Sequence, residues 1–190
     1  TVVLIALGLL LNLFPFFNFE TLRIPGVLQR IGLCYFFASL MYLYAGKWPR
    51  ICITAALLLF YSVLILWVTP HGFGTGSLDP CCNLPGYIDG ALFPGHTYEH
   101  APVPGFDPEG LLTTIPAVAS AMVGVFTAAA AEMSMAGTLR RWIIPCTGFL
   151  IAAAGLALDL FIPINKNLWT PSYVLFMGGL ACIAFFICHY

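Results

Sequence analysis

Long apolar runs constrain what this chain can fold into more than any other feature of its sequence. A helix that crosses the roughly 30 Å hydrocarbon core of a membrane needs about 20 predominantly apolar residues. We therefore predict an all-α fold, a polytopic transmembrane helix bundle that forms a single domain over residues 1–190. The predicted membrane helices are about six, at residues 1–17, 24–46, 51–69, 111–131, 143–162 and 171–190.

The balance of charged and apolar residues gives the same prediction. Only 8% of the residues are charged and 61% are hydrophobic, whereas globular proteins carry about 25% charged residues. The lipid bilayer is therefore the expected surrounding of the chain. The net charge of -1 excludes nucleic acid as a partner, because its binding needs clustered Lys and Arg. Since the chain begins at Thr1 within one apolar run and ends within another, we expect it to belong to a longer protein.

Basic residues predict the orientation in the membrane. Lys47 and Arg50 lie between the second and third segments, and Arg140 and Arg141 lie between the fourth and fifth. Short loops that carry Lys and Arg stay on the cytoplasmic side. The segments predicted to face the outside are 18–23, 70–110 and 163–170.

The outer loop at residues 70–110 has an unusual composition. It contains no Lys or Arg, five acidic residues, seven prolines and eight glycines. Such a loop is either disordered or folded by its own turns. Apolar residues recur after Pro85, which suits the first turn of a helix, so we expect a lid with a short amphipathic helix.

Small residues gather in the fourth and fifth segments. The fourth is rich in Ala between residues 117 and 130, and the fifth contains Gly148, Ala152 and Gly155. Small side chains let membrane helices approach closely. We therefore expect both helices to lie inside the bundle.

The cysteines predict no disulfide framework. Five of the seven lie in apolar runs, where cysteine acts as a small hydrophobe. Cys81 and Cys82 are adjacent in the outer loop, and neighbours in sequence form no ordinary bridge without strain.

Arg30, with its neighbour Gln29, is the first candidate for function. It lies six residues after Ile24, about 9 Å into the predicted helix at 1.5 Å per residue. An arginine at such a depth costs roughly 2.5–3.5 kcal/mol unless it meets water, a partner or a ligand. Its side chain either snorkels to the interface or points inward and binds an acidic residue or a ligand anion.

Acidic residues before the fourth segment form the second candidate group. Asp107 suits the N-cap of that helix, with Pro108 at its first position and Glu109 near its positive end. The alternative is that Asp107 and Glu109, opposite Arg30, bind substrate hydroxyls or move a proton. Asp89, in the same outer loop, is a further candidate for holding a sugar.

The third group lies in the outer loop at residues 163–170. Amide side chains and an aromatic ring are what a ring-shaped polar ligand such as a sugar would contact, and the same residues would also serve as an interfacial anchor. The candidate residues are Asn165, Lys166, Asn167 and Trp169.

A zinc-peptidase pattern in the outer loop is better explained by chance. Residues 96–100 read HTYEH, which matches H-x-x-E-H, but that motif needs a sustained helix. Pro94, Gly95, Pro102 and Pro104 flank it too closely. We expect no metal site, and His96 or His100 would instead be proton carriers.

Three stretches of the chain together resemble a known family. They read LRIPGVLQRIGLCYF, GYIDGALFPGHTYEH followed by DPEGLL, and PINKNLWTPSYVLF. They resemble the heparan-alpha-glucosaminide N-acetyltransferase family, in particular its bacterial branch of N-acetylglucosamine-associated membrane proteins. The resemblance extends over nearly the whole chain.

The resemblance implies a membrane acyltransferase with around ten or eleven helices. In the lysosomal member, an acetyl group from cytosolic acetyl-CoA reaches the amine of a terminal glucosamine on the far side of the membrane. The presumed catalytic histidine of the family lies in an upstream region, near D-x-x-R-G and W-N-G motifs, that this sequence does not contain. His96 and His100 do not match that position, so the resemblance identifies no catalytic residue here.

Residues and resemblance together predict a membrane-embedded acyltransferase that moves an acetyl or acyl group from acyl-CoA to an amino sugar or glycan. Acetyl-CoA is the expected donor. One alternative is a transporter or permease for N-acetylglucosamine or related sugars, in which the same polar residues would line a pathway. A further alternative is a structural fragment with no independent activity. The expected location is the bacterial inner membrane, and a homo-oligomer is compatible with the sequence.

Overall fold

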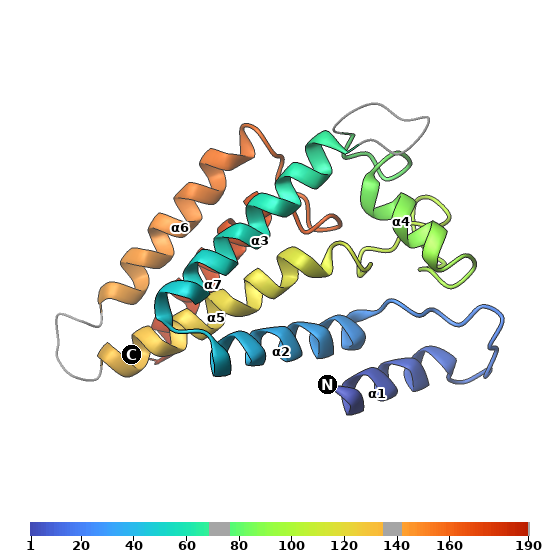
Figure 1. Ribbon diagram of the computed structural model, residues 1–190, viewed down its shortest axis with the longest axis horizontal. Coiled ribbons are helices and arrows are strands. Elements are labelled where there is room, and N and C mark those ends of the chain that lie inside the picture. The colour runs from blue at the N-terminus through green and yellow to red at the C-terminus, as the bar shows by residue number, and fades with distance from the viewer. Residues whose placement is uncertain (69–76, 135–141, 190) are drawn as a thin grey trace.

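A computed structural model describes residues 1–68, 77–134 and 142–189, and within these ranges the regular structure is entirely helical (Figure 1). The described residues form seven helices. They are α1 (Val2–Leu13), α2 (Val27–Tyr44), α3 (Lys47–Trp67), α4 (Leu84–Leu92), α5 (Thr114–Ser134), α6 (Ile143–Asp159) and α7 (Pro171–His189). The predicted all-α fold is confirmed.

Helix length and composition agree with a membrane protein. In the described part of the chain, α2, α3, α5 and α7 are long and apolar enough to cross a membrane, and α1 and α6 are shorter apolar helices. Large apolar side chains on these helices are exposed at the outer surface of the bundle, among them Leu43, Leu59 and Phe149. Lipid would cover such side chains, because a soluble protein rarely exposes wide apolar patches.

Helix α5 lies at the centre of the bundle. It contacts α2, α3, α6 and α7, and Ala119 and Met122 on it are completely buried. The small residues of α5 therefore serve the interior position that the sequence predicts.

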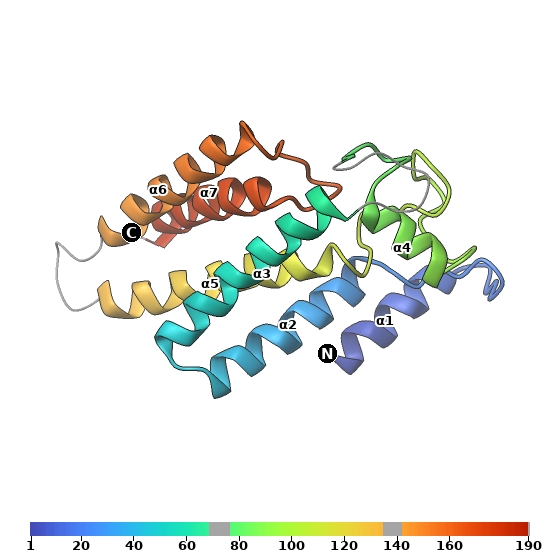
Figure 2. The same ribbon diagram turned by 45° about the horizontal axis from the view of Figure 1, so that its top comes forward.

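Helix α6 lies at the edge instead of the interior, and it packs mainly on α7 (Figures 1 and 2). Three glycines make the close approach possible. A Cβ at Gly148 would lie 2.9 Å from the carbonyl oxygen of Gly179, and a Cβ at Gly155 would overlap the backbone nitrogen of Phe176. The small residues of α6 therefore allow close packing against α7 alone. The opposite face of α6 carries the exposed side chains of Phe149 and Leu150.

The short helix α4 forms where the outer loop was expected to fold. Asn83 caps it by accepting a hydrogen bond from the Gly86 N–H at 2.7 Å, and proline stands in its first turn. A side-chain cap of this kind satisfies a backbone donor that the helix itself leaves unpaired.

Three connections of the bundle gather at one end, next to α4 (Figures 1 and 2). The linker from α1 to α2 meets the loop that follows α4, where the Ile24 N–H donates to the His96 carbonyl oxygen at 2.9 Å. The Tyr61 hydroxyl of α3 donates to the Leu168 carbonyl oxygen in the linker from α6 to α7. This end of the bundle carries the candidate site.

The opposite end carries Lys47 and Arg50, two of the basic residues that predicted the orientation. Arg50 donates from Nε to the Ala45 carbonyl oxygen and from Nη2 to that of Tyr42, both at 2.7 Å, and so closes the end of α2. Arg140 and Arg141 lie outside the described residues.

The contact between α6 and α7 generates a stability prediction. Gly155→Ala should lower the free energy of unfolding by about 1–3 kcal/mol, as overpacking does, because the new methyl group meets backbone that cannot rotate away. Thermal unfolding in detergent measures the change. The matched control is Gly124→Ala in α5, where a Cβ would meet no atom within 4 Å. That variant should be neutral or up to about 1 kcal/mol more stable, since Ala favours helix over Gly. Equal stability of the two variants would contradict the packing argument.

Candidate functional site

Arg23 organises the acidic turn that precedes α5. Its Nε donates to Asp107 Oδ2 at 2.9 Å, and its Nη2 donates to Asp107 Oδ1 at 2.6 Å and to Glu109 Oε2 at 2.5 Å. The guanidinium also lies 4.5 Å from the centre of the Tyr98 ring. Burial alone would lower the pKa of Arg23, but the hydrogen bonds and charges of Asp107 and Glu109 outweigh it and raise that pKa. Arg23 therefore stays charged and neutralises both carboxylates.

The predicted role of Asp107 as the N-cap of the fourth membrane helix is wrong. Its Oδ1 accepts a hydrogen bond from the Glu109 N–H at 2.9 Å, so it caps a turn, and α5 begins only at Thr114. Asp107 is fully buried and its oxygens are already bonded to Arg23. The physical reason is that an ionic partner holds this carboxylate away from the helix end.

Arg30 points inward. The residue is 6% exposed, and its Nη2 donates to the Pro108 carbonyl oxygen at 2.5 Å and to the Thr113 hydroxyl. The guanidinium lies 4.8 Å from the centre of the Trp169 ring. Its Nε and Nη1 are buried and have no hydrogen-bond partner among the described residues. Since an unpaired buried donor costs about 1–3 kcal/mol or more, these nitrogens suit a ligand acceptor.

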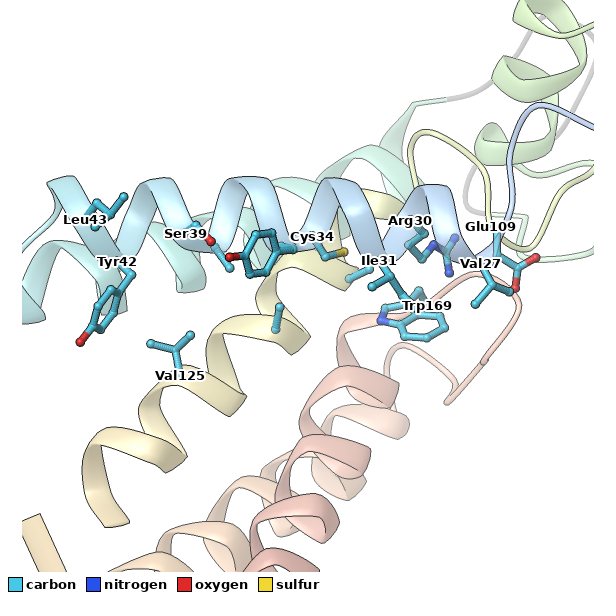
Figure 3. A pocket seen from close by; sticks show the side chains of 14 residues that line it. Val27, Arg30, Ile31, Cys34, Ser39, Tyr42, Leu43, Glu109, Val125 and Trp169 are labelled. Carbon is cyan, nitrogen blue, oxygen red and sulfur yellow. The ribbon is translucent and has the colours of Figure 1, made fainter. Parts of the chain in front are cut away.

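A large cavity of about 830 Å³, open along one side where Tyr35 and Leu43 are exposed, runs beside Arg30 (Figure 3). Arg30, Glu109 and Trp169 gather at one end of it, and Tyr42 and Leu43 lie at the other. Val27 lies at the same end as Arg30. The intervening lining from α2 and α5 is mostly apolar, with Ile31, Cys34, Tyr35, Ala38, Ser39, Ala117, Ala121 and Val125. At 1.5 Å per residue, Val27 and Leu43 lie about 24 Å apart along α2, so the cavity follows most of this helix.

A smaller cavity of about 200 Å³ shares Arg30 and Glu109 with the large one. Gln29 also lines it, together with apolar side chains such as Leu9 and Phe93. The carboxamide of Gln29 is held tightly, because a Cβ at Gly8 would lie 2.5 Å from its Oε1. Its Nε2 is buried without a hydrogen-bond partner in the described chain, so Gln29 is a second residue of this region, after Arg30, with an unpaired donor.

The linker from α6 to α7 splits the third candidate group. Trp169 joins the site: its backbone has a φ of 51°, which is strained for a residue with a side chain, and its Nε1 donates to the Ser120 hydroxyl at 3.0 Å. Asn165 shapes the turn, since its Oδ1 accepts from the N–H groups of Asn167 and Leu168 at 2.9 and 3.3 Å. Lys166 and Asn167 are exposed and line neither of the two cavities.

Asp89 lies behind the site and joins α4 to the turn before α5. Its Oδ1 accepts a hydrogen bond from the Leu111 N–H at 2.9 Å, and a Cβ at Gly110 would overlap its carboxylate. The residue is fully buried. Burial raises the pKa of Asp89 to about 7, with a further increase from the negative charge of Asp107. Asp89 lines neither cavity described above, so its position is that of an anchor.

The residues of the H-x-x-E-H pattern do not form a helix. Residues 96–100 lie in turns and irregular backbone. His96 contacts the Leu22 carbonyl oxygen through Nδ1 at 2.8 Å, and the His100 ring stacks on Tyr98. Among the described residues, no three His, Cys, Asp or Glu side chains are grouped to hold a metal ion.

Sequence reasoning missed Arg23, Tyr98 and Thr113. The only signal for Arg23 was its position just before an apolar run, where a basic residue is ordinary. Its ion pair with Asp107 joins residues 84 positions apart, and no local pattern records such a pairing.

Comparison with known proteins gives a distant relationship. No family model matches the chain. The chain is 29% identical to heparan-alpha-glucosaminide N-acetyltransferase from Mus musculus and, equally, to that from Homo sapiens, over 218 aligned residues. These alignments cover 90% of this chain but 33% and 32% of the relatives, so the chain spans about a third of their length. Together with the apolar helices, this relationship supports an integral membrane protein.

The contacts of Arg30 predict a strong dependence on its side chain. Arg30→Ala should lower the free energy of unfolding, since each hydrogen bond from a charged group contributes about 1.5–3 kcal/mol. Arg30→Lys should recover only part of the loss, because an ammonium group lacks the planar fork of donors. Thermal unfolding in detergent measures both. The control is Lys166→Ala, an exposed position where the change should stay within about 0.5 kcal/mol. If both Arg30 variants were as stable as the wild type, the conclusion that Arg30 is buried and stabilises the fold through its contacts would be wrong.

The raised pKa of Asp89 predicts a pH dependence of stability. Its folded pKa of about 7 lies above the ordinary value of 3.8, so the native state holds this proton more tightly than the unfolded state. The resulting stability is complete below about pH 4 and is lost as the pH rises to 7. Asp89→Asn, which mimics the neutral carboxyl, should weaken the dependence of the free energy of unfolding on pH between about pH 4 and 7. Asp79→Asn, at an exposed position, should leave this dependence unchanged. Thermal unfolding in detergent at a series of pH values measures both. An unaltered slope in Asp89→Asn would show that this carboxyl is ionised in the fold.

Proposed function

We propose that this chain forms part of a membrane-embedded acyltransferase that moves an acetyl group from acetyl-CoA to the amine of an amino sugar or glycan. One observation carries the proposal. The unpaired donors of buried Arg30 lie beside Glu109 and Trp169 at the end of a cavity of about 830 Å³, in a chain that is similar to membrane N-acetyltransferases.

Acetyl transfer to an amine sets three chemical requirements. A base must take the proton of the ammonium group, donors must stabilise the developing oxyanion, and both reactants must be held in position. The site contains candidates for each requirement.

Arg30 supplies the donors in this proposal. Its Nε and Nη1 have no partner in the described chain, and its position is fixed by Pro108, Thr113 and the Trp169 ring. A preorganised donor in a buried site stabilises an oxyanion far better than one in water. Gln29 Nε2, also unpaired, is the second donor of this kind.

Glu109 supplies the carboxylate for the amine. Its Oε2 accepts from Arg23, whereas its Oε1 makes no hydrogen bond within the described residues. The side chain is 21% exposed and lines both cavities. A carboxylate in this position can hold an ammonium group or accept its proton.

Trp169 supplies a ring face for the sugar, and Lys166 and Asn167 are exposed at the outer rim where a glycan would enter. Asn165 supports this rim through its turn. Asp107 acts in this proposal as a support of the site, because it is buried and both of its oxygens bond Arg23. Asp89 is buried and accepts from the Leu111 N–H through Oδ1, whereas its Oδ2 has no hydrogen-bond partner in the described chain. Because Asp89 lines neither cavity, it also acts as a support.

The donor and the setting belong to the same proposal. The family resemblance implies acetyl-CoA and a catalytic histidine from a region outside this sequence. We place the protein in the bacterial inner membrane with loop 70–110 outside, and a homo-oligomer is compatible with this arrangement.

Transfer of label tests the proposed activity. Purified full-length protein with radiolabelled acetyl-CoA and glucosamine should produce labelled N-acetylglucosamine. Glu109→Gln should lower the rate about 10²–10⁴-fold, the usual contribution of a general base, whereas Asp79→Asn should keep it. Proteoliposomes that accumulate labelled N-acetylglucosamine without acetyl-CoA, together with no transfer of label, would instead support the transporter.

A further inference from the structure

Two thiols meet at the start of the lid, away from the site described above. The Sγ atoms of Cys81 and Cys82 are in contact, 2.7 Å apart. Neither cysteine forms a disulfide in the structure. The other five cysteines lie within α2, α3, α6 and α7, so this pair stands apart from them in the outer loop.

We propose that Cys81 and Cys82 are a redox modification site, where a disulfide oxidant of low molecular weight, such as oxidised glutathione, closes a vicinal disulfide. The proposal is independent of the acyltransferase activity. It rests on the sulfur contact and on the different exposure of the two thiols.

Exposure sets the order of the steps. Cys81 is exposed and Cys82 is half-buried, and Cys81 also lies at the edge of a cavity of about 320 Å³ with Tyr87 and Phe106. The Cys81 thiolate attacks one sulfur of the oxidant, which releases the first glutathione thiol and forms a mixed disulfide. The Cys82 thiolate then attacks the Cys81 sulfur and releases the second. Each cysteine loses one proton, and one oxidised glutathione is reduced to two thiols.

The bond should be easily reversed. Adjacent Cα atoms are about 3.8 Å apart across a trans peptide, which is shorter than the 4.4 to 6.8 Å that ordinary disulfides span. A disulfide under such strain, and exposed, belongs to the labile class that thiols readily reduce.

Ring closure would act on the beginning of α4. The Cys82 N–H donates to the Asp79 carbonyl oxygen at 3.1 Å, and Asn83 Nδ2 donates to the same oxygen at 2.7 Å. Asn83 in turn caps α4 through Gly86. A bond between Cys81 and Cys82 would hold the backbone just before this cap, in the helix that carries Asp89.

Differential alkylation tests the proposal in the full chain. Protein treated with oxidised glutathione, quenched in acid and alkylated with N-ethylmaleimide should give a peptide with neither thiol labelled, lighter than the reduced peptide by two hydrogens. Mild dithiothreitol should restore both alkylation sites. The amide of Gly86 should exchange hydrogen more slowly in the oxidised form.

Two single variants separate the roles of the thiols. Cys82→Ser should trap the glutathione adduct on Cys81, whereas Cys81→Ser should collect little adduct on the less exposed Cys82. A stable glutathione adduct in the wild type, a bridge from either cysteine to one of the other five, or a covalent dimer would overturn the proposal. So would full alkylation of both thiols after oxidation.

Discussion

The burial of Arg30 inside an apolar bundle is the constraint on which the end of the bundle next to α4 depends. A guanidinium in this position needs acceptors, and the Pro108 carbonyl oxygen and the Thr113 hydroxyl provide them. The turn before α5 must therefore pack against α2. That turn also carries Asp107 and Glu109, whose charges need a partner of their own, and Arg23 meets this need from the linker between α1 and α2.

The charges at this end of the bundle balance, but not all hydrogen-bond donors of Arg30 have a partner among the described residues. Two guanidinium groups face two carboxylates at this end of the bundle, and Asp89, with a pKa of about 7, adds little negative charge well below pH 7. Because Arg23 bonds both oxygens of Asp107 and one oxygen of Glu109, Arg30 bonds only to neutral groups and keeps two buried nitrogens unpaired. A cation with this environment attracts an anionic or polarised oxygen from a ligand, which is the basis of the proposed chemistry.

The lid depends on the same turn. Helix α4 is held to it by the hydrogen bond between Asp89 and Leu111, and the loop after α4 is held to the linker from α1 to α2 by His96. The cysteine pair lies at the other end of α4, before its cap. The lid and the candidate site are therefore connected through α4. Its start is held by the contacts of Asn83, and Asp89 on it bonds the turn before α5.

The apolar runs by themselves determined the helical bundle and the approximate helix positions, because the hydrocarbon thickness acts on consecutive residues. The short helix in the loop followed from Pro85 and the apolar residues that recur after it, because the signals that start a helix are also local. The apolar runs also singled out Arg30, since a charge in an apolar run is visible locally. Only the tertiary structure decided that Arg30 points inward, that Asp107 pairs with Arg23 and does not cap α5, and that α6 lies at the edge. The same packing brings Trp169 to Arg30 and leaves Lys166 and Asn167 at the rim. These outcomes depend on which distant segments meet, and the partner of a buried charge is chosen by packing across the whole bundle, which no local pattern encodes.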